Sequence, residues 1–302
     1  MKIAIIGSGL AGSSLATLLN EHEVDVFTDL KASASSIAAG MLHKFVGLEN
    51  KKNPLADSAY DESVRFIKKH APEHIHETTI VRLALNETQV EKWEKAARLY
   101  PELKWVSDAS KMGPYPSYPA LLVPGAIVDC PEYLKKLHSN LNIIVRRIET
   151  IEELSNYDQV VIASGPMRFK EQNEIKTHLL KGQLLEFPFS LDLPSPINSS
   201  AYFIKKGSMA ILGATFERSF ESAEPDFKTA YKELNPYFET FFPSIKMGEA
   251  KVKSGLRVTT PDRLPIAKRL NERLLILNGF GSRGLLYHVY FSNMLVKNFL
   301  KS

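Results

Sequence analysis

Three glycines near the N-terminus have the spacing of a dinucleotide-binding turn. Gly7, Gly9 and Gly12 form a G-x-G-x-x-G pattern that follows an apolar run at residues 2–6 and opens an apolar stretch reaching about Asn20. The first glycine permits a tight turn, the second lets the backbone approach a pyrophosphate, and the third lets the helix pack closely on the strand. Free N–H groups at the start of the helix favour negative charge. The predicted nucleotide contacts are Gly7, Gly9, Leu10, Ala11 and Gly12.

An acidic residue is expected about 20 residues after the first glycine, where it binds ribose hydroxyls. Asp29 follows Gly7 by 22 residues and lies at the end of a second predicted strand, residues 24–28. Asp25 is the competing carboxylate, but it lies inside that strand. The sequence therefore favours Asp29, and the glycine pattern alone does not separate NAD from FAD.

Two further glycine-containing turns each follow a predicted buried strand. The strand at 159–163 ends in Ala163, Ser164 and Gly165, small residues that let a backbone pass close to a flat group. The strand at 274–278 runs into a turn that opens the last predicted helix. Its backbone donors suit an anion or an electron-rich oxygen. The residues of this second turn are Gly281, Ser282, Arg283, Gly284 and Leu285.

Arg257 stands in a Gly-Leu-Arg word just before a Thr-Thr-Pro-Asp turn. A guanidinium offers two parallel donors that match a carboxylate, so Arg257 is a candidate substrate clamp. The alternative is an ordinary ion pair with a carboxylate of the chain such as Asp262.

Composition limits the remaining possibilities. The chain has 302 residues, 44% apolar and 24% charged, as an ordinary globular protein has. No apolar run reaches the length of a membrane span, and the N-terminus has no signal-peptide pattern. A single cysteine, Cys130, excludes an internal disulfide and favours a reducing compartment, the cytoplasm. The net charge of +4 fits either solvated surface or a diffuse phosphate-facing patch.

Strand patterns that suit a parallel sheet lie at both ends and in the middle of the chain, with a hairpin-like stretch at 201–214 between them. We therefore predict an α/β fold with two interleaved regions. Residues 1–78, 126–180 and 253–302 are assigned to nucleotide binding, and residues 79–125 and 181–252 to the substrate.

These motifs, in this order, resemble the FAD-dependent amine oxidoreductases of the D-amino-acid oxidase and glycine oxidase family. The resemblance also includes the small-residue stretch 35–41, Lys181-Gly182-Gln183 and Gly213-Ala214-Thr215. It implies a Rossmann-type FAD-binding domain interleaved with a mostly antiparallel-sheet substrate domain. It further implies non-covalent FAD, with Ser36 and Gly40 near the pyrophosphate and ribityl chain, residues 281–285 facing the flavin ring, and Arg257 binding a substrate carboxylate.

Within that family, three short words are similar to the oxidoreductase domain of bifunctional tRNA-modifying enzymes: Leu212 to Arg218, Asp129-Cys130-Pro131 and Gly281 to Leu285. This implies removal of the carboxymethyl group from carboxymethylaminomethyl-uridine at the wobble position of tRNA, giving aminomethyl-uridine and glyoxylate. A separate methyltransferase would then act downstream. The alternatives are a small-molecule amine oxidase or dehydrogenase, acting on glycine, sarcosine or a D-amino acid, and a flavin-binding partner without catalysis.

Several other residues are interpreted mainly as structural. His70, His74 and His76 lack a Cys or acidic ligand set at metal spacing, so no metal site is expected. Tyr202, Tyr287 and His288 are assigned to packing, with a place near the substrate or the flavin as the alternative.

Overall fold

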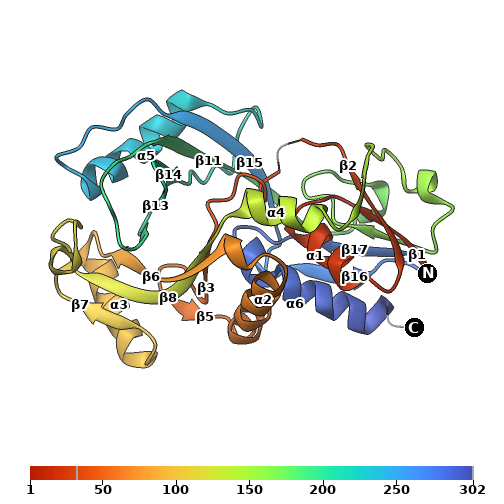
Figure 1. Cartoon of the computed structure of the whole chain (residues 1–302), viewed down its shortest axis with the longest axis horizontal. Coiled ribbons are helices and arrows are strands. Elements are labelled where there is room, and N and C mark those ends of the chain that lie inside the picture. Colours follow the sequence, from red (N-terminus) through yellow and green to blue (C-terminus); the bar gives the residue numbers. More distant parts are fainter. Residues whose placement is uncertain (32, 301–302) are drawn as a thin grey trace.

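The computed structural model describes residues 1–31 and 33–300, and these residues are organised around two sheets (Figure 1). The first sheet has six strands in the order β16-β17-β10-β1-β2-β9. Its strands are β1 (Lys2–Ile6), β2 (Glu23–Thr28), β9 (Asn142–Val145), β10 (Gln159–Ile162), β16 (Ile266–Arg269) and β17 (Leu274–Asn278). All pairings are parallel except that of β16 with β17.

Apolar residues bury both faces of the central strands β1, β10 and β17, which is why these strands are nearly continuous apolar runs. Ile3 and Ile5 of β1 pack in one cluster with α1 (Leu10–Leu18), α2 (Ala56–His70) and α6 (Gly284–Leu295). Ala4 and Ile6 face the opposite side and pack with residues from 148–169. The N-termini of α1 and α6 therefore lie on the same side of the sheet.

The second sheet is mostly antiparallel and has the path β15-β11-β14-β13-β12-β6-β8-β3, with β7 paired to β8. Its strands are β3 (Met41–His43), β6 (Ile75–Leu83), β7 (Lys104–Val106), β8 (Ala120–Val128), β11 (His178–Pro188), β12 (Ile197–Asn198), β13 (Tyr202–Lys206), β14 (Met209–Gly213) and β15 (Lys251–Thr259). The remaining elements are the small pair β4 (Phe45–Val46) and β5 (Lys51–Lys52), and helices α3 (Glu87–Leu99), α4 (Cys130–His138) and α5 (Phe227–Phe241).

The predicted fold class, a parallel nucleotide-binding sheet interleaved with a mostly antiparallel one, is confirmed. The sequence-based boundaries put residues 253–259 with the nucleotide region, whereas β15 pairs with β11 over nine residues in the second sheet. Residues 75–78 of β6 likewise pair with β8. The division into two domains with those boundaries stays a prediction.

Within residues 1–31 and 33–300, no helix is long and apolar enough to cross a membrane. The expected cytoplasmic location stays a prediction.

The last helix is buried on nearly all sides, and His288 lies inside this core. Its Nδ1–H donates to the carbonyl oxygen of Leu285 at 2.9 Å, and its Nε2 accepts from the hydroxyl of Tyr133 at 3.0 Å. Burial lowers the pKa of His288 from 6.5 to about 4. The ring is therefore neutral and ties α6 to α4, which is a packing role.

This burial predicts a loss of stability in acid. His288 takes up a proton near pH 6.5 in the unfolded chain but only near pH 4 in the folded chain. The contribution of neutral His288 to the free energy of unfolding is therefore complete above pH 6.5 and is lost as the pH falls toward 4. Between pH 7.5 and 5 the free energy of unfolding should fall by about 2 kcal/mol through His288 alone. Urea unfolding of His288→Gln should show a pH dependence smaller by that amount, with His76→Gln, an exposed site, as the control. Equal pH dependence in the wild type and His288→Gln would contradict this assignment.

Candidate functional site

The first glycine turn joins β1 to α1 and lies against the end of β10. Gly7 has a φ of +110°, and a Cβ there would lie 2.3 Å from the carbonyl oxygen of Ala163. A Cβ on Gly12 would lie 1.9 Å from the carbonyl oxygen of Gly7. Side chains at these two positions would push the helix off the sheet, as the sequence pattern predicts.

The amide groups of this turn are left available. Within the described residues, the N–H groups of Ser8, Gly9 and Ala11 have no acceptor, and that of Leu10 donates to the hydroxyl oxygen of Ser35 at 3.2 Å. The ring of His138 stabilises the turn, because its Nε2–H donates a hydrogen bond to the carbonyl oxygen of Ser8 at 2.9 Å. Free amides at a helix N-terminus fit a pyrophosphate.

The two carboxylates considered for the ribose have different surroundings. Asp25 is buried and accepts from the hydroxyl of Tyr157 at 2.5 Å and from the side-chain amide of Asn142, so it holds strands together. Asp29 is exposed just after β2, and its carboxylate accepts only from the N–H of Lys31, at 3.1 Å, among the described residues. Asp29 is therefore the available carboxylate, and its ribose contact stays a prediction.

The small-residue stretch after β2 contacts the glycine turn, and the side chain that makes this contact is Ser35 rather than Ser36. The hydroxyl of Ser36 donates to the carbonyl oxygen of Ser33 at 3.0 Å, within its own turn. The carbonyl of Gly40 accepts from the N–H of Val128 at 2.8 Å, which attaches the stretch to the second sheet. Sequence reasoning did not single out Ser35, because adjacent serines give no signal of which one faces α1. The predicted places of Ser36 and Gly40 near the pyrophosphate and ribityl chain stay predictions.

The second glycine turn is fixed to the same region by two hydrogen bonds. The side-chain amide of Asn278 donates to the carbonyl oxygen of Gly165 at 2.8 Å, and the N–H of Gly281 donates to the carbonyl oxygen of Val258 at 2.8 Å. In the described part of the chain, the N–H groups of Ser282, Gly284 and Leu285 have no acceptor.

The two helix N-termini meet where α1 packs on α6. A Cβ on Gly284 would lie 3.3 Å from a methyl carbon of Leu10. The structure thus brings together the predicted residues of the first turn (7–12), the β10 end (163–165) and the second turn (281–285).

A neutral histidine that sequence reasoning did not single out lies near this second turn. His43 ends β3, and burial lowers its pKa from 6.5 to about 3, with the charges of Arg82 and Arg283 acting in the same direction. Its Nδ1 has no partner among the described residues. Arg283 has no carboxylate within 4 Å in that part of the chain, so it remains available to an anion.

Arg257 lies on β15 with its guanidinium over Gly182 of β11. A Cβ on Gly182 would lie 2.3 Å from Nη2 of Arg257, so the glycine makes room for the guanidinium. Among the described residues no carboxylate lies within 4 Å of Arg257, and Asp262 accepts from the N–H of Leu264 at 3.0 Å instead. Burial lowers the pKa of Arg257. The ion pair with Asp262 is therefore not formed.

Tyr202 of β13 lies on the same face of the second sheet. A Cβ on Gly213 would lie 2.6 Å from the Tyr202 hydroxyl, which shows that the ring leans over this glycine toward β11. Burial raises the pKa of Tyr202 to about 12, so the phenol keeps its proton at neutral pH. The hydroxyl is a donor on the face that carries Arg257.

Successive side chains of β11 point to opposite faces of the second sheet. Leu185 and Phe187 pack against α5, which covers the outer face (Figure 1). Gly182 and Leu184 point the other way, toward Arg257 and Tyr202. On this inner face, a Cβ on Gly255 would lie 2.8 Å from a methyl carbon of Ile37, in the segment beside the glycine turn. Arg257 therefore faces the nucleotide-binding sheet.

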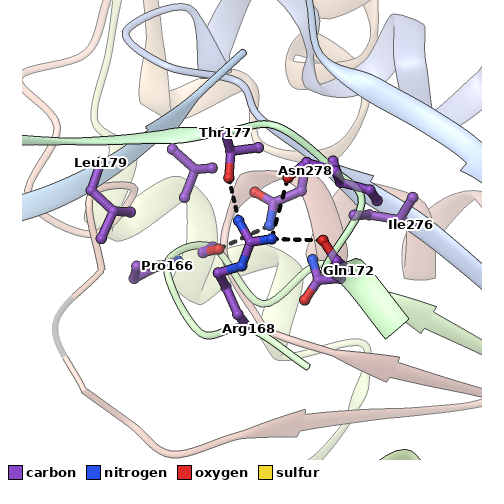
Figure 2. A pocket seen from close by; sticks show the side chains of 10 residues that line it. Pro166, Arg168, Gln172, Thr177, Leu179, Ile276 and Asn278 are labelled. Carbon is purple, nitrogen blue, oxygen red and sulfur yellow. Dashed lines mark hydrogen bonds between the residues drawn. The ribbon is translucent and has the colours of Figure 1, made fainter. Parts of the chain in front are cut away.

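A small cavity of about 150 Å³ lies beside these turns, between the end of β10, β17 and the start of β11. Figure 2 shows Arg168 at its centre, where Nη1 donates to the Thr177 hydroxyl at 2.7 Å and Nη2 to the Gln172 carbonyl at 2.6 Å. The cavity is below the range of about 300–1,000 Å³ usual for a small-molecule site. Its arginine has partners, so we assign it a structural role.

No group of three or more His, Cys, Asp or Glu side chains in residues 1–31 and 33–300 is placed to hold a metal ion.

Comparison with known proteins identifies related sequences and folds. The family model described as "FAD dependent oxidoreductase" matches residues 2–297. The tRNA 5-methylaminomethyl-2-thiouridine biosynthesis bifunctional protein MnmC of Maricaulis maris (strain MCS10) is 27% identical, over 93% of this chain and 49% of that protein. The protein of that name from Marinobacter nauticus is 23% identical, over 94% of this chain and 53% of that protein. The chain thus spans about half the length of the curated relatives it matches.

Solved structures with a similar fold include two glycine oxidases. That of Geobacillus kaustophilus has a TM-score of 0.84 at 19% identity, covering 99% of this chain and 94% of that one. That of Bacillus cereus ATCC 14579 has a TM-score of 0.84 at 21% identity, covering 98% and 96%. These similarities support the fold.

The geometry of the first turn predicts that Gly9→Val abolishes FAD binding. A branched side chain would occupy the space where the backbone meets the pyrophosphate, and the Cβ alone would lie 3.0 Å from the hydroxyl oxygen of Ser35. The absorbance of released FAD measures occupancy. Gly248→Val is the matched control, because the nearest atom to a Cβ there is 4.0 Å away. A Gly9→Val protein that purified with full FAD would refute the assignment of residues 7–12.

Asp29→Ala should weaken FAD binding less than Gly9→Val does, because the pyrophosphate contacts remain.

Proposed function

The chain belongs to the family of FAD-dependent oxidoreductases, its cofactor is FAD, and from this premise we propose that it oxidises a secondary amine of the form R–NH–CH2–COO⁻. The family resemblance expected from the motifs is confirmed. The observation that carries the proposal is Arg257, a half-buried guanidinium without a carboxylate partner in the described residues, on the sheet face that looks toward the nucleotide-binding turns.

Arg257 would hold the substrate carboxylate. A guanidinium on a strand, seated over Gly182, has little freedom to turn, so two parallel N–H donors present a fixed site to the two carboxylate oxygens. The Tyr202 hydroxyl on the same face would donate a further hydrogen bond. Fixing the carboxylate at one end fixes the adjacent methylene carbon, and such positioning contributes much of the rate.

FAD, when bound, supplies the acceptor for the hydride that leaves the methylene carbon. The amine nitrogen loses a proton as its C=N bond forms, and water then adds to that bond and releases R–NH2 and glyoxylate. In this scheme the chain need not supply a strong base for the carbon, provided the amine binds neutral. The free N–H groups of Ser282, Gly284 and Leu285 and the guanidinium of Arg283 are assigned to the electron-rich edge of the flavin.

For R we propose the methylene arm of a wobble uridine in tRNA, so that carboxymethylaminomethyl-uridine becomes aminomethyl-uridine. The support is the pair of tRNA-modifying relatives, aligned over 93% and 94% of this chain, and the net charge of +4. A methyltransferase acting downstream and a cytoplasmic location belong to this proposal. The similarity in fold to glycine oxidases favours a second candidate, oxidation of a free amino acid such as glycine or sarcosine.

Incubation of the FAD-loaded protein with tRNA bearing carboxymethylaminomethyl-uridine tests the substrate. Nucleoside mass spectrometry should show conversion to aminomethyl-uridine, with an equal amount of glyoxylate. The same protein should reduce its flavin slowly with free glycine or sarcosine under anaerobic conditions. An unchanged nucleoside profile together with rapid bleaching by a free amino acid would replace the tRNA proposal with the second candidate.

Arg257→Lys tests the clamp. Lysine keeps a positive charge but loses the two parallel donors, so kcat/KM should fall about thirty-fold or more, equivalent to at least about 2 kcal/mol. FAD content should not change, because Arg257 faces the substrate. Arg98→Lys, in an exposed i,i+4 ion pair on α3, is the control. Wild-type kinetics in Arg257→Lys, or a loss fully explained by a lower Tm, would remove Arg257 from the site.

A further inference from the structure

The segment that follows β14 continues alongside β11 and is firmly held there. The N–H of Thr215 donates to the carbonyl oxygen of Gln183, and the N–H groups of Lys181 and Glu217 donate to each other's carbonyl oxygens, each at 3.0 Å. Partly buried side chains add to this, since the Glu217 carboxylate accepts from the Thr215 hydroxyl at 2.6 Å and from the Gln183 amide at 3.0 Å. The backbone of residues 215–217 is therefore fixed like that of a strand.

This register decides where Phe216 and Arg218 point. Thr215 and Glu217 lie with Gln183, which is on the α5 side of β11. Side chains alternate along an extended segment, so Phe216 and Arg218 point to the opposite face, the one that carries Gly182, Arg257 and Tyr202. Phe216 lies opposite Gly182 across the strand pair, and Gly182 holds the guanidinium of Arg257 on its other side.

Phe216 and Arg218 form an exposed aromatic and cationic pair on that face. The Phe216 side chain is 54% exposed, which is unusual for a phenylalanine fixed by its backbone, and the guanidinium carbon of Arg218 lies 5.7 Å from the ring centroid. No carboxylate lies within 4 Å of Arg218 in residues 1–31 and 33–300. A flat apolar ring and a free guanidinium are thus presented together beside the proposed amine site.

We propose that Phe216 and Arg218 form a stacking platform for the nucleobase that carries the aminoacetate arm. This rests on the proposed tRNA reaction and names the residues that would receive the base. Every base has a π-face, and stacking on an aromatic side chain stabilises it. Arg218 adds an attraction for the base and for the flanking phosphates. A free amino acid such as glycine or sarcosine has no ring that could stack on this surface.

The spacing of the strands fits the length of the arm. One strand spacing, about 5 Å, separates the Phe216 segment from Gly182, over which the guanidinium of Arg257 lies. The four bonds from the ring to the carboxylate of the arm span roughly 5 Å, at the usual lengths of C–C and C–N bonds. A base on Phe216 can therefore place its carboxylate on Arg257.

Binding of a labelled anticodon stem-loop RNA bearing carboxymethylaminomethyl-uridine tests the platform, with FAD-loaded protein and fluorescence anisotropy as the readout. Phe216→Ala should raise the Kd about tenfold, within the range for one stacked base, and Phe216→Trp should keep wild-type affinity. Arg218→Gln should weaken binding and reduce its salt dependence. Phe227→Ala is the matched control, since Phe227 is 46% exposed but belongs to α5 on the outer face. FAD content and Tm report on folding.

The possible results distinguish a failure of the proposed platform from a failure of the proposed reaction. If the wild type binds and oxidises the RNA while Phe216→Ala matches Phe227→Ala in affinity, the platform is wrong and the proposed function stands. If the wild type neither binds nor oxidises the RNA, the proposed function fails and the platform fails with it. Loss of affinity in Phe216→Ala, retained affinity in Phe216→Trp and no change in Phe227→Ala would support the platform.

Discussion

A guanidinium partly removed from water without a counter-charge destabilises the folded state, and the arrangement around Arg257 depends on this constraint. Removing a charge from water costs several kcal/mol unless an opposite charge or hydrogen bonds compensate it. In the described residues Arg257 has no carboxylate partner, and burial lowers its pKa. A substrate carboxylate would supply the missing partner, so binding and positioning would come from the same contact.

The fold holds Arg257 in this position through the backbone of its own strand. The strand β15 pairs with β11 over nine residues, and Gly182 leaves the space that the guanidinium fills. Val258, the next residue, accepts a hydrogen bond from Gly281 in the second glycine turn. The proposed substrate clamp and the turn assigned to the flavin are therefore one residue and one hydrogen bond apart. A change in the pairing of β15 would move both together.

Local chemistry made part of this site predictable from sequence. Gly7 and Gly12 are required by contacts within one β-α unit, so their spacing alone identifies the turn, and the place of Asp25 inside its strand favours Asp29. Tertiary contacts decide the rest. Segments distant in sequence decide that Ser35 rather than Ser36 faces α1, that His43 is buried, and to which side Phe216 points. The boundary drawn at residue 253 divides β15 because the pairing of β15 with β11 has no local signal.

The claim that Arg257 is an open carboxylate site facing the flavin is tested most directly by a visible difference spectrum. Oxidised FAD-loaded protein is titrated with glycolate, a carboxylate that lacks the amine. We expect a saturable change in the flavin bands of the wild type and none in Arg257→Gln of equal FAD content. An equal change with equal affinity in Arg257→Gln would contradict it.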